Sequence, residues 1–473
     1  MKRNLTLVYA GCLLTGTVLA QSPVTVTISP GASSAAIPAD FVGLSFGMKT
    51  LLPDGEGAHF FSATNTPLVT LFQNLGIRHL RLGGTTVESP PSVAIPGDPD
   101  IDNLFAFVRA AQVNKVIYSL RLLETDAARH YAETDAAIAK YIWSKYRPYL
   151  DYFAIGNEPD RRAIYDQDVA ITNFGTYRSK WRQFATAITD AVPEAKLGGP
   201  DAGSGNVSWT TRFAKAERNA GIIGVVTEHF YVGGAGKDVS AQEGIDTMLS
   251  PEWLSANQKL YDKMATPVLA DGLAYRFTEA NDHYSGGVPG ASDTFAGALW
   301  ELDFLHWWAG HDASGVNFHN TQWVVNDVIT LDPNRRLTLN PKGYGLKAFD
   351  LGGHGSIESV AIANPDGINL TAYAVRGTGE RLVTLINKEH GSGAREAKVT
   401  LAAPGSAKRA DVIFLIAPGG DAAAKTGVTL GGAAINADGL WVGKWKPLPA
   451  GKHGQYAVKV PATSAAIVRI AAQ

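Results

Sequence analysis

The stretch YFAIGNEPD, residues 152–160, joins a short apolar run to Gly156, Asn157, Glu158 and Pro159. The run is typical of a buried strand, and Pro159 ends it because proline has no N–H to donate to a sheet. A glutamate at the end of such a strand is either a solvated turn residue or a catalytic acid. The segments on either side of the stretch decide between these two interpretations.

From residue 40 to residue 350, strand-like runs alternate with amphipathic stretches of helical length. This alternation predicts parallel strands joined by crossover helices. Eight units of this kind predict an α/β fold, the (β/α)8 TIM barrel. The strand candidates are residues 41–48, 77–84, 115–122, 152–158, 195–202, 224–232, 267–279 and 315–320.

After residue 351, short alternating runs separated by Gly, Asn and Pro turns continue to the C-terminus. This pattern predicts a C-terminal antiparallel β-sandwich. Residues 24–30, VTVTISP, alternate in the same way, and we expect this N-terminal strand to join the sandwich. A chain of 473 residues exceeds what one core usually organises. The predicted units are a signal peptide at 1–20, the N-terminal strand at 21–38, a catalytic barrel at 39–350 and a sandwich domain at 351–473.

The N-terminus, MKRNLTLVYAGCLLTGTVLAQSP, has two basic residues followed by an apolar stretch too short to span a bilayer. It ends in small residues before Gln21, which predicts a secretory signal peptide and a secreted or periplasmic protein. The only cysteine, Cys12, lies inside this peptide, so no disulfide is expected in the mature chain. Lipoprotein anchoring at Cys12 is the less favoured alternative. No other stretch predicts a membrane span.

Composition argues against several classes of function. The formal net charge is -2, and the 42 Lys and Arg residues form no dense basic run. A nucleic-acid partner is therefore not expected. The 11 His residues show no spacing typical of a metal site, and no glycine fingerprint for a nucleotide follows a strand. The sequence predicts neither a metal nor another cofactor.

The barrel favours the catalytic interpretation of Glu158, because active sites in this fold lie at the C-terminal ends of the strands. Retaining hydrolysis of a glycosidic bond needs a second carboxyl group about 5 to 5.5 Å away. The candidates are Glu228 and Glu279. If Tyr231 points into the barrel mouth, strand alternation sends His229 the same way and Glu228 outward. We therefore favour Glu279.

The two glutamates are 121 residues apart, which is 279 minus 158 and fits three βα units. They then lie on the fourth and seventh strands, which face each other across the barrel mouth. The pairing predicts Glu158 as the general acid/base and Glu279 as the nucleophile.

Several motifs carry a family resemblance. The GNEPD stretch, together with TEANDHYSGG at 278–287, resembles the retaining glycosidases of the largest (β/α)8 clan, and more narrowly glycoside hydrolase family 79. This is the heparanase and β-glucuronidase family, and the chain looks most like its bacterial exo-β-glucuronidases. The similarity extends to LRLGGT, EHFYVGG, PKGYGLKAF and VPATSAAIVRI, at 80–85, 228–234, 341–349 and 460–470.

The resemblance implies roles for further residues beside the two glutamates. It implies that Asn157 binds the 2-hydroxyl group of the sugar and that Tyr231 hydrogen-bonds the nucleophile. It also implies that the loop after the nucleophile holds the uronate carboxylate through Tyr284, Ser285 and Gly286. A phenol and successive backbone N–H groups can bind an anion without a fixed cation.

The sequence departs from animal heparanase in the segment at 86–99, TVESPPSVAIPGDP, which is short where that enzyme has a long excised linker. Together with the absence of basic clusters, this favours exo-acting removal of terminal β-linked glucuronic acid from oligosaccharides or glycoconjugates. The alternatives are endo-acting heparanase-like cleavage, or another activity of the clan such as that of an arabinofuranosidase or xylosidase. From a different class, a non-catalytic secreted carbohydrate-binding protein would also keep the barrel.

Overall fold

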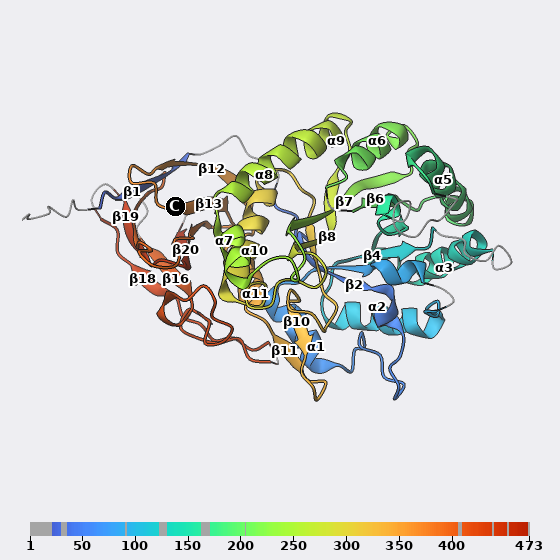
Figure 1. Ribbon diagram of the computed structural model, residues 1–473, viewed down its shortest axis with the longest axis horizontal. Coiled ribbons are helices and arrows are strands. Elements are labelled where there is room, and N and C mark those ends of the chain that lie inside the picture. The colour runs from blue at the N-terminus through green and yellow to red at the C-terminus, as the bar shows by residue number, and fades with distance from the viewer. Residues whose placement is uncertain are drawn as a thin grey trace, which may run out of the picture.

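The computed structural model describes residues 21–29, 36–89, 92–122, 130–161, 171–203, 205–404, 409–437, 439–451 and 454–471. The predicted signal peptide and Cys12 lie outside this range, so secretion stays a prediction. A barrel and a curled β-sheet lie side by side along the long axis (Figure 1). Within the described residues, no helix has both the length and the apolar character that crossing a membrane requires.

Eight parallel strands close into a barrel in chain order, which confirms the predicted fold class. Its interior is filled by side chains such as Ile117, Tyr152 and Val225. A Cβ atom on Gly198 would lie 2.3 Å from the Tyr152 ring, so glycine is needed there. The strands are β2 (Val42–Gly47), β3 (His79–Gly83), β4 (Lys115–Leu120), β5 (Leu150–Ile155), β6 (Leu197–Ala202), β7 (Ile223–Gly233), β8 (Tyr275–His283) and β9 (Val316–His319).

Helices surround the barrel (Figure 1) and bury their apolar faces against it. They are α1 (Thr66–Leu75), α2 (Asp98–Ala110), α3 (Tyr131–Tyr146), α5 (Phe174–Ala191), α6 (Val207–Glu217), α7 (Ala241–Leu249), α8 (Glu252–Leu260), α9 (Thr266–Ala270), α10 (Phe295–Ala309) and α11 (Lys342–Gly352). Shorter helical turns are η1 (Met48–Leu51), η2 (Thr85–Glu88), η4 (Arg147–Tyr149), η5 (Tyr261–Ala265) and η6 (Pro418–Gly420). A hairpin of β10 (Ile329–Leu331) and β11 (Leu337–Leu339) follows the last barrel strand.

The seventh barrel strand, β8, differs from its predicted bounds at both ends. The predicted strand at 267–279 is wrong at its start, because residues 266–270 form α9. Pro267 lies in the first turn of that helix, where its missing N–H costs nothing, and Gly272 then turns the chain with a φ of 75°. The strand begins at Tyr275 and continues beyond Glu279 to His283.

The C-terminal sheet is a single curled sheet whose two halves face each other over a shared core that includes Val26, Val383, Val399 and Val468. The N-terminal strand β1 (Val24–Ser29) joins it, antiparallel to β12 and parallel to β15. The other strands are β12 (Ser356–Ala363), β13 (Leu370–Arg376), β14 (Glu380–Asn387), β15 (Ala397–Ala402), β16 (Ala410–Ile416), β17 (Thr429–Leu430), β18 (Lys446–Leu448), β19 (Tyr456–Val460) and β20 (Ser464–Ala471).

The helix α10 joins the two parts of the molecule. All of its side chains are buried, which is typical of a helix packed between two layers. Its Asp303 accepts a hydrogen bond from Tyr373 on β13 (2.6 Å) and pairs with the buried ammonium of Lys388, which directly follows β14 (2.6 Å). His306 stacks on Tyr373. These contacts fix the barrel against the sheet.

Candidate active site

Glu158 follows β5 in a turn of unusual backbone conformation. Gly156 has a φ of 88° and Glu158 a φ of 46°, a region that non-glycine residues seldom occupy. The turn is fixed at both ends, because Gly156 N–H donates to Leu120 O (2.8 Å) and Glu158 N–H donates to Asp201 O (2.9 Å). Strain of this kind persists where surrounding contacts determine the backbone, and it is common at functional sites. The side chain of Glu158 is 21% exposed.

Glu279 lies on β8, buried and held by hydrogen bonds at both carboxylate oxygens. Tyr231 on β7 donates its hydroxyl to Oε1 (2.8 Å), and Arg81 on β3 donates to Oε2 (2.9 Å). Its orientation is therefore fixed from two sides. The other candidate acid, Glu228, points away from this site and accepts a hydrogen bond from Thr210 on α6. This is the arrangement that strand alternation predicts.

Both glutamates meet at His229. Its Nδ1 lies 3.0 Å from Glu158 Oε1 and 4.0 Å from Glu279 Oε1. One carboxylate oxygen of each glutamate and this ring nitrogen all lie within 4.8 Å of one another. The barrel thus brings together two acids that are 121 residues apart in the sequence. Paired carboxyl groups at this spacing can act together on one bond, because a reacting atom fits between them.

Burial by itself raises the pKa of Glu279, because it penalises the charged form. The charges of His319, His229 and Arg81 outweigh burial and hold the pKa of this carboxyl well below its ordinary value. The Nδ1 atom of His319, at the end of β9, lies 3.6 Å from Glu279 Oε2. Glu279 is therefore ionised throughout the neutral range, as a nucleophile must be.

His229 is fully buried between the two acids. Burial lowers its pKa, but the neighbouring Glu279 and Glu158 raise it more, so that its pKa lies above the ordinary value for histidine. An imidazole that keeps its proton to higher pH brings a positive charge to the point where the two acids meet. It therefore offsets part of the repulsion between them.

Arg81 is the centre of the polar network. Its guanidinium is buried and donates to Glu279, Asn157 Oδ1 (2.8 Å), Asp201 Oδ2 (3.1 Å) and Ser45 Oγ (3.1 Å). Burial opposes its charge, but Asp201 and Glu279 raise the pKa of Arg81 above its ordinary value. The contact with Asn157 Oδ1 turns the amide so that its NH2 group faces away from the arginine.

The predicted uronate loop follows β8 directly. Tyr284 is 41% exposed, and the next three residues all have positive φ, of 56° at Ser285 and 89° at Gly286 and Gly287. Two hydrogen bonds from Asn326 fix the loop: its side-chain amide donates to His283 O (2.8 Å) and its backbone N–H donates to Gly286 O (3.3 Å). Among the described residues, no hydrogen bond joins this loop to either glutamate.

The structure therefore joins some of the predicted site residues directly and leaves others beside the site. Glu158, Glu279, Asn157 and Tyr231 belong to one network of contacts. Tyr284, Ser285 and Gly286 lie on the adjoining loop. Sequence reasoning did not assign functional roles to Arg81, Asp201, His229 and His319. The signal for Arg81 was present, because a charged residue inside a buried strand needs an opposite charge.

Glu158, His229 and Glu279 are also ligand types for a divalent cation. The surroundings fit a cation poorly, because both oxygens of Glu279 already accept hydrogen bonds and one of these comes from the guanidinium of Arg81. A second positive charge would lie beside that arginine. The donor set is better explained as a pair of acids held by neighbouring side chains.

The buried position of Arg81 predicts a large loss of stability on substitution. Arg81→Met removes the cation between Asp201 and Glu279 and leaves two buried carboxylates without it. Breaking a buried pair in this way costs about 3 to 5 kcal/mol of unfolding free energy. Urea denaturation followed by circular dichroism measures the change. Arg147→Met is the matched control, since Arg147 pairs with Glu194 at the surface and should change stability little. Equal losses in both variants would contradict the role of Arg81.

Comparison with known proteins places the two parts of the chain in one family. Residues 124–306 match the N-terminal domain of glycosyl hydrolase family 79. Residues 372–467 match the C-terminal beta domain of the same family. The two matches together span more than half of the chain and include both glutamates.

Individual relatives are more distant. A β-glucuronidase of Aspergillus niger is 28% identical over 206 residues, which cover 37% of this chain and only 36% of that protein. Among solved structures, a 4-O-α-L-rhamnosyl-β-D-glucuronidase of Fusarium oxysporum has a TM-score of 0.75 at 16% identity, covering 94% of this chain and 99% of its own. A family 51 arabinofuranosidase of Xanthomonas axonopodis pv. citri has a TM-score of 0.66 at 14% identity, covering 95% and 99%. At such identities the structural likeness shows the fold alone.

Proposed function

The chain belongs to glycosyl hydrolase family 79, and from this premise we propose that it is a retaining β-glucuronidase that removes terminal glucuronic acid from oligosaccharides or glycoconjugates. The observation that carries the proposal is the spacing of the two acids, whose nearest oxygens lie within 4.8 Å. Retaining enzymes have carboxyl groups about 5 to 5.5 Å apart, and inverting enzymes hold them about 6.5 to 9.5 Å apart to admit a water. The spacing here supports direct attack by a carboxylate.

In the proposed first step, a carboxylate oxygen of Glu279 attacks the anomeric carbon of the glucuronate. The bond from that carbon to the glycosidic oxygen breaks, and Glu158 gives its proton to the departing oxygen. In the second step Glu158 takes a proton from water, whose oxygen attacks the same carbon and releases Glu279. Tyr231 and Arg81 keep the nucleophile in place by their hydrogen bonds to its two oxygens. The amide of Asn157 is proposed to bind the 2-hydroxyl group.

A panel of aryl glycosides tests the proposal. The purified protein should hydrolyse an aryl β-glucuronide and leave the corresponding β-xyloside and α-arabinofuranoside almost unchanged. The stereochemistry of the first sugar released, followed by NMR, should be β, since two displacements restore the starting configuration. Preference for either neutral glycoside would support another activity of the clan, and turnover of none would support a carbohydrate-binding protein without catalysis.

Uronate specificity depends in this proposal on the loop of Tyr284, Ser285 and Gly286. Tyr284→Phe should lower kcat/KM for an aryl β-glucuronide about 10- to 100-fold, because a hydrogen bond to a charged group is lost. The matching neutral β-glucoside has no carboxylate and should change much less. The ratio of the two kcat/KM values is the measurement.

Tyr141→Phe is the matched control for this experiment. The Tyr141 hydroxyl donates to Asp102 (2.8 Å) on the outer helices, away from the barrel mouth. Its loss should leave the ratio of glucuronide to glucoside hydrolysis as it is in the wild type. A ratio that Tyr284→Phe does not change would remove the case for this loop as the uronate site.

A further inference from the structure

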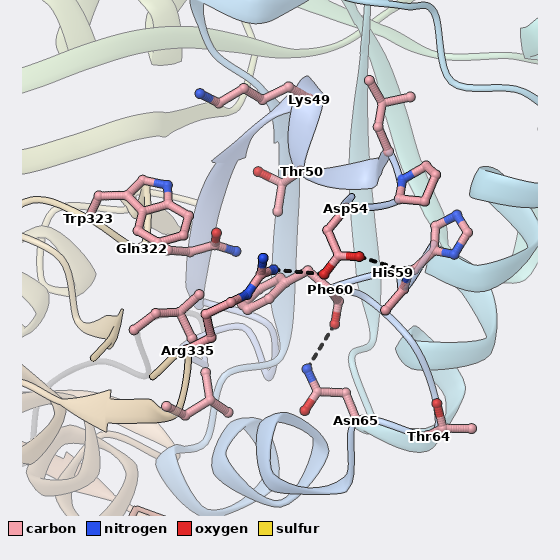
Figure 2. Close-up of a pocket in the computed structure, with 15 residues that line it drawn as sticks. Lys49, Thr50, Asp54, His59, Phe60, Thr64, Asn65, Gln322, Trp323 and Arg335 are labelled. Carbon is pink, nitrogen blue, oxygen red and sulfur yellow. Dashed lines mark hydrogen bonds and ion pairs between the residues drawn. The ribbon is translucent and has the colours of Figure 1, made fainter. Parts of the chain in front are cut away.

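A cavity of about 500 Å³ is lined by residues that follow β2 and β9, and Figure 2 shows these residues. One wall comes from the residues that follow β2 and includes Lys49, Asp54 and His59. The opposite wall comes from the residues after β9 and the β10–β11 hairpin, and includes Trp323 and Arg335. Its volume is in the range of sites that enclose small ligands.

The cavity is lined by residues that follow β2 and β9, two strands that also contribute to the catalytic network. The strands β2 and β9 are neighbours in the barrel, with Ser45 paired to His319. Ser45 accepts a hydrogen bond from Arg81, and His319 lies 3.6 Å from Glu279. Lys49 follows Ser45 by four residues, and Trp323 follows His319 by four residues. The cavity therefore begins on the same rim as the nucleophile's neighbours.

The cavity and Glu158 lie on opposite sides of the barrel mouth. Glu158 follows β5, and in the closed order of eight strands β5 is opposite β9. The acid that protonates the leaving group stands on the side from which the aglycone departs. The part of the barrel rim at the ends of β2 and β9 therefore lies on the non-reducing side of the bound glucuronate.

Trp323 is presented to solvent by a rigid turn. Its side chain is 60% exposed, the residue before it, Gln322, has a φ of 80°, and the turn around them is braced. Asp327 accepts hydrogen bonds from Thr321 N (2.7 Å) and Val324 N (3.1 Å). A strained and braced turn that leaves a large aromatic ring in solvent is typical of a binding surface. Figure 2 shows the indole at the edge of the cavity.

The charged groups of the cavity leave an excess of positive charge. Arg335 is paired with Asp54 (2.7 Å) at the cavity wall, and His59 is paired with Asp100 (2.7 Å). Lys49 is exposed and forms no ion pair with any described residue. An exposed ammonium beside an exposed indole suits a ligand that has both a carboxylate and an apolar face of C–H groups. A uronic acid in its ring form has both features.

We propose that this cavity is a subsite for a second, acidic sugar, linked to the non-reducing side of the glucuronate in the catalytic centre. Trp323 stacks on the sugar ring and Lys49 pairs with its carboxylate. The inference rests on the proposed hydrolysis of a β-glucuronide bond by Glu158 and Glu279. It changes one part of the proposed function, because the preferred glucuronate then carries a further sugar and the favoured product is an acidic disaccharide rather than terminal glucuronic acid.

Three aryl β-glucuronides test this subsite. The first is unextended, the second carries a further glucuronate at the non-reducing end, and the third carries glucose there. We expect kcat/KM to be about tenfold higher for the acidic extension than for the unextended substrate. Trp323→Ala should remove most of this preference, and Trp323→Phe should restore part of it, which separates stacking from misfolding. Lys49→Met should lower kcat/KM for the acidic extension relative to the neutral one by about tenfold.

Lys259→Met, on the outer helix α8, is the matched control and should leave all three ratios unchanged. If the unextended glucuronide is hydrolysed but an acidic extension brings no gain, the subsite is refuted and the proposed function stands. If no glucuronide is hydrolysed, the proposed function fails, and calorimetry with a glucuronate disaccharide then decides the subsite alone. Binding weakened by Trp323→Ala would support the subsite, and absence of binding would refute it.

Discussion

Glu279→Gln is expected to reduce hydrolysis of an aryl β-glucuronide by about 10⁴-fold or more, as is usual when a nucleophile is removed. The amide cannot form the glycosyl ester, because its nitrogen and oxygen are poor nucleophiles without the negative charge. Steady-state kinetics on the purified variant measures the loss. Calorimetry on the same variant should still detect glucuronide binding, since Tyr231 can still donate to the amide oxygen.

Glu228→Gln is the matched control for this prediction. Glu228 is a buried glutamate on the neighbouring strand, bonded to Thr210 and turned away from the site. Burial raises the pKa of Glu228 well above its ordinary value, which favours the neutral carboxyl, and a Gln side chain resembles that form closely. Activity should stay within a fewfold of the wild type. A Glu279→Gln enzyme with more than a tenth of wild-type activity would contradict the proposed nucleophile.

Glu158→Gln is expected to separate the two steps of the reaction. Natural glucuronides have poor leaving groups that need a proton, so their hydrolysis should fall about 10²- to 10⁴-fold. An aryl glucuronide with an acidic phenol leaves without that proton, and its first step should be largely spared. Its second step needs the base and should be slow. Rapid mixing should then show a burst in which each enzyme molecule releases about one molecule of phenol, followed by a slow steady rate.

The comparison of the two substrates within one variant is the control for folding in this experiment. A misfolded enzyme would lose activity on both substrates by the same factor and would give no burst. Equal losses on both would therefore refute the role of Glu158 as the acid/base. Removal of the burst by the added change Glu279→Gln would confirm that the burst depends on the nucleophile.

The barrel, the sandwich and the pair of acids could be predicted from the sequence because each depends on local patterns and on strand order. A period of two marks the strands, helical stretches separate them, and a glutamate lies at or near the end of two of them. Once eight strands close in chain order, the fourth and seventh strand ends face each other. The start of β8 was predicted wrongly, because its apolar residues fit a short helix and a strand equally well, and Pro267 favours the helix.

The tertiary structure decided what surrounds the acids. Arg81, Asp201, His229 and His319 come from four different strands, and their contacts with Glu158 and Glu279 depend on the stagger of the strands rather than on any one segment. The register between β7 and β8 shifts between Glu228 and His229, which alternation alone does not reveal. Local periodicity thus determined which strand ends carry the two glutamates. Closure of the barrel determined which distant side chains form hydrogen bonds with these glutamates and keep Glu279 ionised.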